Sequence, residues 1–428
     1  MTAAAVLSSL LFLAALAIIF TEKMHRSITA IAGAALMVAM GRLFGFYSEE
    51  AALQAIDLRT LGLLLGMMIL VSMLEPTGFF QYLAVSAAQR SRGRPVRLFI
   101  LLGGITSVVS MFMDNVTTVV LIAPVTILIC EILGIGALPY LLAEALLSNT
   151  GGVATLVGDP PNVLIGSAAN LSFGDFLTHS LPIVVVAWAG ALGLLLYLFR
   201  RELWRRPRNV RALMRMTPGD ALNEPAIARR LLVVLGFAIL FFLFDPLLHL
   251  SPAFIAMGAA GAALVWIRPN IEATLKRIEW SVLIFFAALF VMVGGLEAAG
   301  VWEAVVSAVQ MASNVPPVYF GIGLLWATAI FSAVVDNVPV TIALIPIIQG
   351  LGKTGMDIGP LWWAVAFGAG FGGNGTIIGS TANIIVTSLS ERTRQPITAQ
   401  LWLRRGLPIM LVTCLIASVL YYLLYRWF

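Results

Sequence analysis

The chain has 428 residues, of which 60% are hydrophobic and 11% are charged. A soluble globular domain carries about 25% charged residues. A soluble fold could not bury this much apolar surface, so the composition excludes a soluble domain and indicates a protein whose solvent is the lipid bilayer. The formal net charge of +5 comes from short basic loops between apolar runs, which excludes a nucleic-acid-binding face. Cys130 and Cys414 lie in separate apolar runs, so neither a disulfide framework nor a zinc site is expected.

Apolar segments of spanning length recur along the whole chain. The first has no basic residue before it, whereas Lys23 and Arg26 follow it, so we interpret it as a membrane span and not as a signal peptide. Two other apolar regions, 96–134 and 317–350, are each interrupted in the middle by an Asp-Asn pair. The predicted spans lie at about 3–20, 27–45, 60–74, 139–169, 181–200, 231–247, 251–267, 280–296, 361–390 and 406–427.

The loops between these runs indicate the orientation, because short cytoplasmic loops are enriched in Lys and Arg. The stretches 46–57 and 297–316 contain neither residue and are assigned to the outside. These assignments are consistent if 96–134 and 317–350 are re-entrant hairpins, which leaves ten full spans and both termini outside. The alternative, in which the two regions are further full spans, would leave the number of spans even. The basic loops carry Lys23 and Arg26; Arg90, Arg92, Arg94 and Arg97; Arg200, Arg201, Arg205, Arg206, Arg208, Arg211, Arg215, Arg229 and Arg230; Arg268, Lys276 and Arg277; and Arg392, Arg394, Arg404 and Arg405.

The chain also contains an internal repeat with an offset of 222 residues, which becomes 221 after one slip. We therefore expect a first transmembrane repeat at 1–200, a basic cytoplasmic linker at 201–230 and a second repeat at 231–428. The predicted orientation inverts the second repeat, as in many secondary transporters. The fold class expected is an all-α polytopic membrane protein with two inverted repeats. The matched landmarks are Asp57 with Glu279, Leu74-Glu75 with Leu296-Glu297, Asp114-Asn115-Val116 with Asp336-Asn337-Val338, Pro124 with Pro346, Gly151-Gly152 with Gly372-Gly373, and Asn162 with Asn383.

Each repeat contains two polar interruptions, one at the Asp-Asn tip and one in a glycine-rich break, at 148–162 and 370–383. A helix unwound in the membrane exposes backbone groups, and these are tolerated only where they are buried in protein or line a wet cavity. Glycines alone would also fit close helix packing, but the neighbouring Asn and Thr side chains favour a transport site. The predicted substrate-binding residues are Asn115, Thr117, Asn149, Thr150, Gly151, Asn162, Asn337, Gly373, Asn374, Thr376 and Asn383.

Four acidic residues are candidates for proton coupling, because a carboxyl group inside a membrane is costly and indicates function. Asp114 and Asp336 are related by the repeat, and each could instead cap the helix that starts at its tip. Asp159 has Ser380 as its counterpart and Glu144 has Val365, so both break the symmetry. No catalytic or metal-binding residue is predicted, and no cofactor is expected.

The segment Ser148-Asn149-Thr150-Gly151-Gly152 through Gly158-Asp159-Pro160-Pro161-Asn162, with the paired Asp-Asn-Val tips, resembles the ArsB/NhaD branch of the ion transporter superfamily. That branch includes arsenite efflux permeases, sodium/proton antiporters and the pigment-linked P protein. The resemblance covers nearly the whole chain and implies two re-entrant hairpins, an elevator-like or rocking alternation and ion or proton coupling. More distant relatives carry citrate and dicarboxylates.

The distribution of cations in the sequence bears on the substrate. Residues 111–170 contain no Lys or Arg, and 317–391 contain only Lys353. Because multivalent anions usually meet a fixed cation, we expect proton-coupled efflux of arsenite or antimonite as the neutral hydroxide from the inner membrane. Sodium/proton antiport is the alternative, and dicarboxylate or organic-anion transport is a further one; a channel or an enzyme is not expected. Candidate partners are a cytoplasmic ATPase subunit and a second copy of the chain.

Overall fold

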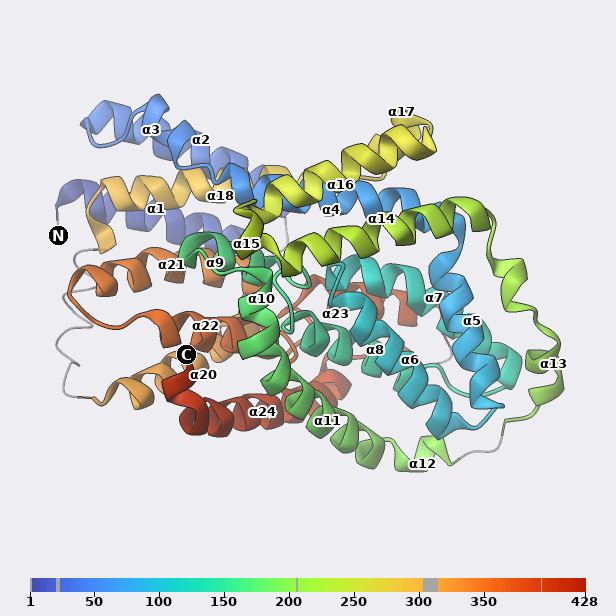
Figure 1. The fold of residues 1–428 in the computed structure, drawn as a ribbon. Helices are drawn as coiled ribbons and strands as arrows, with labels where there is room; N and C mark the ends of the chain where they lie inside the picture. The colour runs from blue at the N-terminus through green and yellow to red at the C-terminus, as the bar shows by residue number, and fades with distance from the viewer. Residues whose placement is uncertain (1, 21–23, 205–206, 303–314, 394) are drawn as a thin grey trace.

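The computed structural model describes residues 2–20, 24–204, 207–302, 315–393 and 395–428, and every regular element in these ranges is helical (Figure 1). The orientation markers Lys23, Arg205, Arg206 and Arg394, and most of the base-free stretch 297–316, lie outside the described residues. Before the linker, the helices are α1 Ala3–Phe20, α2 Arg26–Phe44, α3 Glu49–Gln54, α4 Leu58–Leu74, α5 Phe79–Ser91, α6 Pro95–Ser110, α7 Asn115–Leu133, α8 Leu138–Gly152, α9 Pro160–Ala169, α10 Phe173–Asp175 and α11 Leu181–Leu198.

Short helices in the linker and long helices after it complete the fold. Within the described ranges, eight helices have the length and apolar composition needed to cross a membrane. The remaining helices are α12 Arg200–Leu203, α13 Val210–Arg215, α14 Pro225–Leu243, α15 Asp245–Leu248, α16 Pro252–Ile267, α17 Ile271–Lys276, α18 Trp280–Ala298, α20 Pro317–Val334, α21 Asn337–Lys353, α22 Gly359–Gly372, α23 Thr381–Ser390 and α24 Ala399–Leu424.

The predicted spans coincide with helices, and the all-helical fold class is confirmed. The predicted spans 139–169 and 361–390 are each divided by the glycine-rich break, into α8 and α9 and into α22 and α23. Helix α14 begins six residues before the predicted start at 231, because its first turns continue through Arg229 and Arg230, which interrupt the apolar run. Sequence reasoning missed α5, since Gln81, Gln89 and Arg90 make it too polar to resemble a span.

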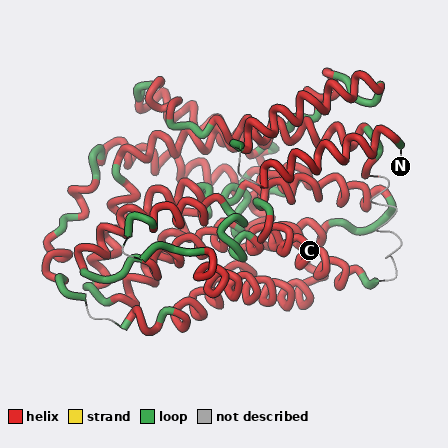
Figure 2. Tube along the Cα trace, turned by 180° about the vertical axis from the view of Figure 1, so that it is seen from behind, coloured by secondary structure: helices red, strands yellow, loops and turns green. Residues whose placement is uncertain are grey.

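Equivalent helices of the two repeats run in opposite directions. Helix α2 leads to α3, whereas its counterpart α16 leads to α17, and α3 and α17 lie at opposite ends of the helix bundle (Figure 1). The view from behind shows the same long, roughly parallel axes (Figure 2). The basic helices α12 and α13 share one end of the bundle with α17, which carries one Glu and one Lys, and acidic α3 lies at the other.

The repeats interlock instead of packing as separate bodies. Helix α4 packs against α16 and α18 against α2, while the hairpin helix α7 packs against α23 and α21 against α9. The broken helices of each repeat therefore contact the hairpin of the other repeat. Large apolar side chains remain exposed on the outer helices, as expected for surfaces that face lipid; examples are Leu10, Leu13, Phe254, Phe331 and Leu415.

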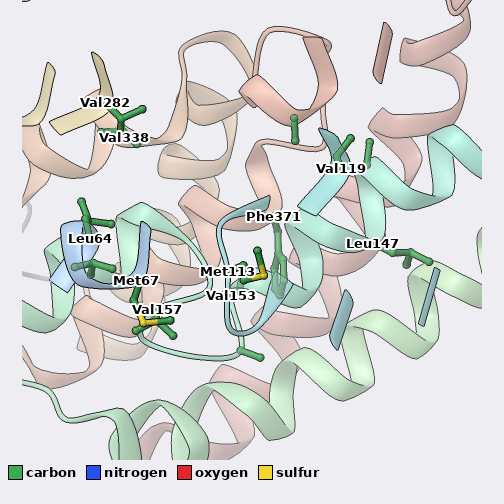
Figure 3. Packing of buried hydrophobic residues seen from close by; sticks show 14 of the residues in the cluster. Leu64, Met67, Met113, Val119, Leu147, Val153, Val157, Val282, Val338 and Phe371 are labelled. Carbon is green, nitrogen blue, oxygen red and sulfur yellow. The ribbon is translucent and has the colours of Figure 1, made fainter. Parts of the chain in front are cut away.

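Buried apolar side chains from both repeats surround the broken segments (Figure 3). Val153, beside the first break, packs so closely against Gly370 of the second repeat that a Cβ at Gly370 would lie 2.2 Å from Val153 Cγ2. Phe371 and Met113 belong to the same buried cluster. The core therefore fixes the two breaks against each other.

Candidate functional site

A cavity of about 310 Å³ lies where the hairpin tips meet α4, α18 and the starts of α9 and α23. We call it the central cavity. One wall is apolar and includes Leu63, Met67, Phe285 and Phe286. The polar lining consists of Arg26, Ser72, Glu75, Asp114, Asn115, Thr117, Asp159, Arg277, Glu279, Asp336, Asn337, Ser380 and Thr381.

The structure brings some of the predicted site residues together and places others behind them. Six line the central cavity, namely Asp114, Asn115, Thr117, Asp159, Asp336 and Asn337. The others lie outside its lining, namely Glu144, Asn149, Thr150, Gly151, Asn162, Gly373, Asn374, Thr376 and Asn383.

A chain of buried amides connects the cavity to the interior of both repeats. Asn115 Nδ2 donates to Asn149 Oδ1 at 2.8 Å and to Ser380 Oγ at 3.4 Å. Asn149 Nδ2 in turn donates to the Oδ1 atoms of Asn374 at 3.0 Å and Asn383 at 2.9 Å. Asn374 Nδ2 then donates to Thr150 Oγ1 at 3.1 Å. A buried network of this kind fixes its members in one arrangement.

Asn162 and Asn383 hold the broken backbone. Asn162 Nδ2 donates to the carbonyls of Gly152, Val153 and Thr155, the last at 2.8 Å. Asn383 Nδ2 makes the equivalent bonds, to Gly373 O at 2.7 Å and Thr376 O at 2.9 Å. Backbone groups freed by a break must find partners inside the membrane, and these amides supply them.

The glycines and threonines of the breaks pack closely, against the hairpins or within the break itself. A Cβ at Gly151 would lie 2.8 Å from Ser107 O, and one at Gly373 would lie 3.0 Å from Gly379 O. The Thr376 hydroxyl donates to Ala333 O at 2.5 Å. Close packing therefore explains these glycines in this conformation.

The aspartates at the two tips cap the helices that begin there, which is the structural alternative that the sequence left open. Asp114 Oδ1 accepts a hydrogen bond from Thr117 N at 3.0 Å, and its Oδ2 accepts one from the Thr117 hydroxyl at 2.6 Å. Asp336 Oδ1 accepts from Val338 N at 3.2 Å. Thr117 also connects this tip to Glu279, whose Oε1 lies 3.4 Å from its hydroxyl.

Asp159 has a different environment from the tip aspartates. It precedes α9, is 1% exposed and lines the central cavity. Its two carboxylate oxygens accept from Asn337 Nδ2 at 3.3 and 3.2 Å, and it belongs to neither ion pair recorded for the described residues. The equivalent pair in the other repeat is Asn115 and Ser380, so only one side carries a carboxyl group.

The prediction of a site without a fixed cation is wrong. Arg26 Nη1 donates to Asp336 Oδ2 at 3.2 Å and to Thr381 Oγ1 at 3.0 Å, and its Cζ lies 5.4 Å from the centroid of the Phe285 ring. Arg277 also lines the cavity. Both arginines are distant in sequence from the motifs and reach them through the interlocked fold. Sequence reasoning also missed Glu279 and Thr381 as site residues, although Glu279 was a landmark of the repeat.

Glu144 lies away from the other three acidic candidates, on α8 where it faces α7. Its side chain is fully buried, and Thr126 Oγ1 donates to Oε1 at 2.5 Å. Among the described residues, Oε2 has no hydrogen-bond partner. Glu144 does not contribute to the lining of the central cavity.

Apolar helices, inverted repeats and a polar cavity between broken helices define the chain as a multi-pass membrane transporter. The model of the citrate transporter family, CitMHS, matches residues 16–368, and the chain belongs to this family. It is 36% identical to a 46 kDa membrane protein of Mycobacterium leprae, over 98% of this chain and 99% of that one. An uncharacterized transporter of Mycobacterium tuberculosis is 37% identical over 97% of each chain.

The chain is also similar to two further proteins. The human P protein is 33% identical over 93% of this chain and 57% of its own length. A crystal structure of the Alcanivorax borkumensis YdaH transporter, which has an unusual topology, covers 100% of this chain and 99% of its own, with a TM-score of 0.62 and 15% identity. The last match shows a shared fold alone. The narrower assignment to the ArsB/NhaD branch stays a prediction.

Proposed function

We propose that the protein is a proton-coupled secondary transporter of the inner membrane, with Asp159 as the coupling residue. The observation that carries the proposal is the position of this carboxyl group, buried in the wall of the central cavity at the interface of the repeats. A coupling group must contact the cavity and must be able to gain and lose a proton. Asp159 lacks the cation that holds Asp336 and the cap bonds that hold Asp114.

The charge of the central cavity supports a neutral substrate. Two guanidinium groups, Arg26 and Arg277, face five carboxyl groups, so a multivalent anion would meet an excess of acidic side chains. A neutral trihydroxide such as arsenite or antimonite matches the hydroxyl and amide lining, because each of its groups both donates and accepts. We therefore propose efflux of these hydroxides as the leading function. The five carboxyl groups belong to Glu75, Asp114, Asp159, Glu279 and Asp336.

A second candidate, transport of citrate or a related carboxylate, is favoured by the two arginines and by the description of the family. An Arg fork matches a carboxylate bidentately. In the described structure, Arg26 hydrogen-bonds its protein partners through Nη1.

Transport by the purified protein in liposomes tests these proposals. With an imposed pH gradient, we expect accumulation of labelled arsenite that collapses with a protonophore and is abolished in Asp159→Asn. Labelled citrate and sodium are assayed in parallel. Accumulation of citrate alone would indicate that the substrate is a carboxylate and not a metalloid hydroxide. Sodium flux alone would favour sodium/proton antiport. Arsenite accumulation that persists in Asp159→Asn would remove this residue from coupling.

A further inference from the structure

A second cavity, of about 650 Å³, lies beside α4 and α9, which also border the central cavity. We call it the far cavity. It is formed by the first turn of α4, the last turn of α9 and the segments around Ser172 and His249. Its lining is mixed, with apolar side chains beside charged ones such as Arg59, Asp175 and Asp245.

The two cavities follow one another along α4. The far cavity contacts Arg59, Thr60 and Leu63, and the central cavity contacts the helix from Leu63 onward to its C-cap, Glu75. At 1.5 Å per residue, this stretch rises by about 24 Å. The hydrocarbon core of a bilayer is about 30 Å thick, so the two cavities together follow most of that thickness.

The same order holds along α9, read in the opposite direction. The central cavity contacts Asp159, Pro160 and Val163 near the start of the helix, and the far cavity contacts it from Val163 onward to Asn170. Leu63 and Val163 are the two residues that line both cavities. They are only 3% and 2% exposed, so little free space separates them from their neighbours.

We propose that the far cavity is the vestibule of the transport path on the opposite side of the membrane, and that Leu63 and Val163 form the apolar barrier between it and the central cavity. An apolar constriction excludes water and blocks polar solutes without any charged gate. The inference rests on the transport role of the central cavity but not on the choice of substrate or on coupling through Asp159.

The internal repeat places apolar side chains at the positions equivalent to Leu63 and Val163. The offsets of 222 and 221 residues match Leu63 with Phe285 and Val163 with Ile384. Phe285 and Ile384 line a third cavity, of about 300 Å³, which also shares Arg26 and Asp336 with the central cavity. Phe285 lines both the third cavity and the central cavity, whereas Ile384 lines the third cavity and not the central one. The second pair is accompanied by the Arg26–Asp336 ion pair.

Cysteine accessibility tests the proposal without substrate or a pH gradient. In a background with Cys130→Ala and Cys414→Ala, single cysteines replace Met68 in the central cavity or Ser167 in the far cavity. A membrane-impermeant methanethiosulfonate reagent is then added to one face of oriented vesicles. We expect the two cysteines to react from opposite faces. In Leu63→Ala/Val163→Ala, the cysteine at position 68 should react from the far-cavity face at least tenfold faster.

The matched control is Leu70→Ala/Leu164→Ala, which removes buried side chains of the same two helices that line neither cavity. Reaction of both cysteines from the same face would overturn the proposal. So would barrier variants that react across the protein no faster than the control. If the double variant does not give a monodisperse protein, Leu63→Val alone gives the same measurement with a smaller expected increase. If the two cysteines react from opposite faces but arsenite is not transported, the proposed substrate is refuted and the proposed transport path stands.

Discussion

Asp114, Asp159 and Asp336 are all acidic residues beside broken helices, but their surroundings indicate different roles. Asp114 and Asp336 accept backbone N–H bonds as helix caps, and Asp336 is also paired with Arg26. Within the described part of the chain, the Asp159 side chain accepts hydrogen bonds from Asn337 Nδ2 alone. A cap or an ion pair stabilises the charged form, whereas a carboxyl group held by one neutral amide can exchange its proton at a smaller structural cost.

Substitution of the tip aspartate separates capping from coupling. Asn caps a helix about as well as Asp, whereas Ala loses the cap at a cost of about 1 kcal/mol. We therefore expect Asp114→Asn to retain transport driven by a pH gradient and Asp114→Ala to lower the thermal stability of the detergent-solubilised protein. Loss of gradient-driven accumulation in Asp114→Asn, with passive exchange intact, would place the coupling proton at the tip.

Arg26 is the cation that sequence reasoning did not place at the site. Arg26→Gln should reduce the maximal transport rate at least tenfold, because it releases Asp336 and Thr381 from one guanidinium and leaves a carboxylate unpaired at the cavity. Arg42→Gln is the control, because the Arg42–Glu49 pair is exposed on both sides and exposed pairs contribute little. Equal transport rates in the two variants would show that Arg26 is dispensable.

At the scale of elements, the glycine-rich breaks are positioned by close backbone contact. Helix α8 lies so near α6 that Gly151 faces the backbone of Ser107, and Gly372 faces that of Ala329 on α20 in the same way. Because the obstructing atoms belong to backbone, they cannot move aside as a flexible side chain would. The two contacts are related by the repeat and hold each break against the first helix of its own hairpin.

A methyl group at this contact should therefore force the helices apart. In Gly151→Ala, the new Cβ would lie 2.8 Å from Ser107 O, and we expect a loss of about 1–3 kcal/mol in stability, as for other overpacked cores. Gly104→Ala is the matched control on α6, because a Cβ there meets nothing within 4 Å. Thermal unfolding in detergent measures both variants, and equal midpoints would contradict the packing argument.

For the whole molecule, the interlocked inverted repeats determine which loops share a side. The basic helices α12 and α13 lie at the same end of the bundle as α17, opposite α3 (Figure 1). The positive-inside rule assigns the basic end to the cytoplasm.

Sidedness can be measured at two exposed positions. We expect a cysteine in place of Leu53, on α3, to react only from outside, and one in place of Ala273, on α17, only from the cytoplasm. Both substitutions sit on short surface helices, so transport activity serves as the control for correct folding. Labelling of both from one face would contradict the inverted arrangement.

The spanning helices other than α5, the inverted repeat and the positions of the breaks could all be predicted from the sequence. Each is a local or periodic property: apolar length predicts a span, glycine with Asn and Thr predicts a break, and a constant offset between landmarks predicts a repeat. The same offset also makes the Asn115–Ser380 pair equivalent to the Asn337–Asp159 pair, although it does not predict the contact within either pair.

The residues that meet at the central cavity could not be predicted from the sequence, because they come together through the packing of the two repeats. Arg26, Arg277 and Glu279 lie on loops or helix ends far from the motifs, and they reach the hairpin tips because α2 and α18 cross to the opposite repeat. Asn162 and Asn383 instead turn toward backbone carbonyls that the breaks leave without partners. Contacts between distant segments depend on how the two halves interlock, and no window of sequence contains that information.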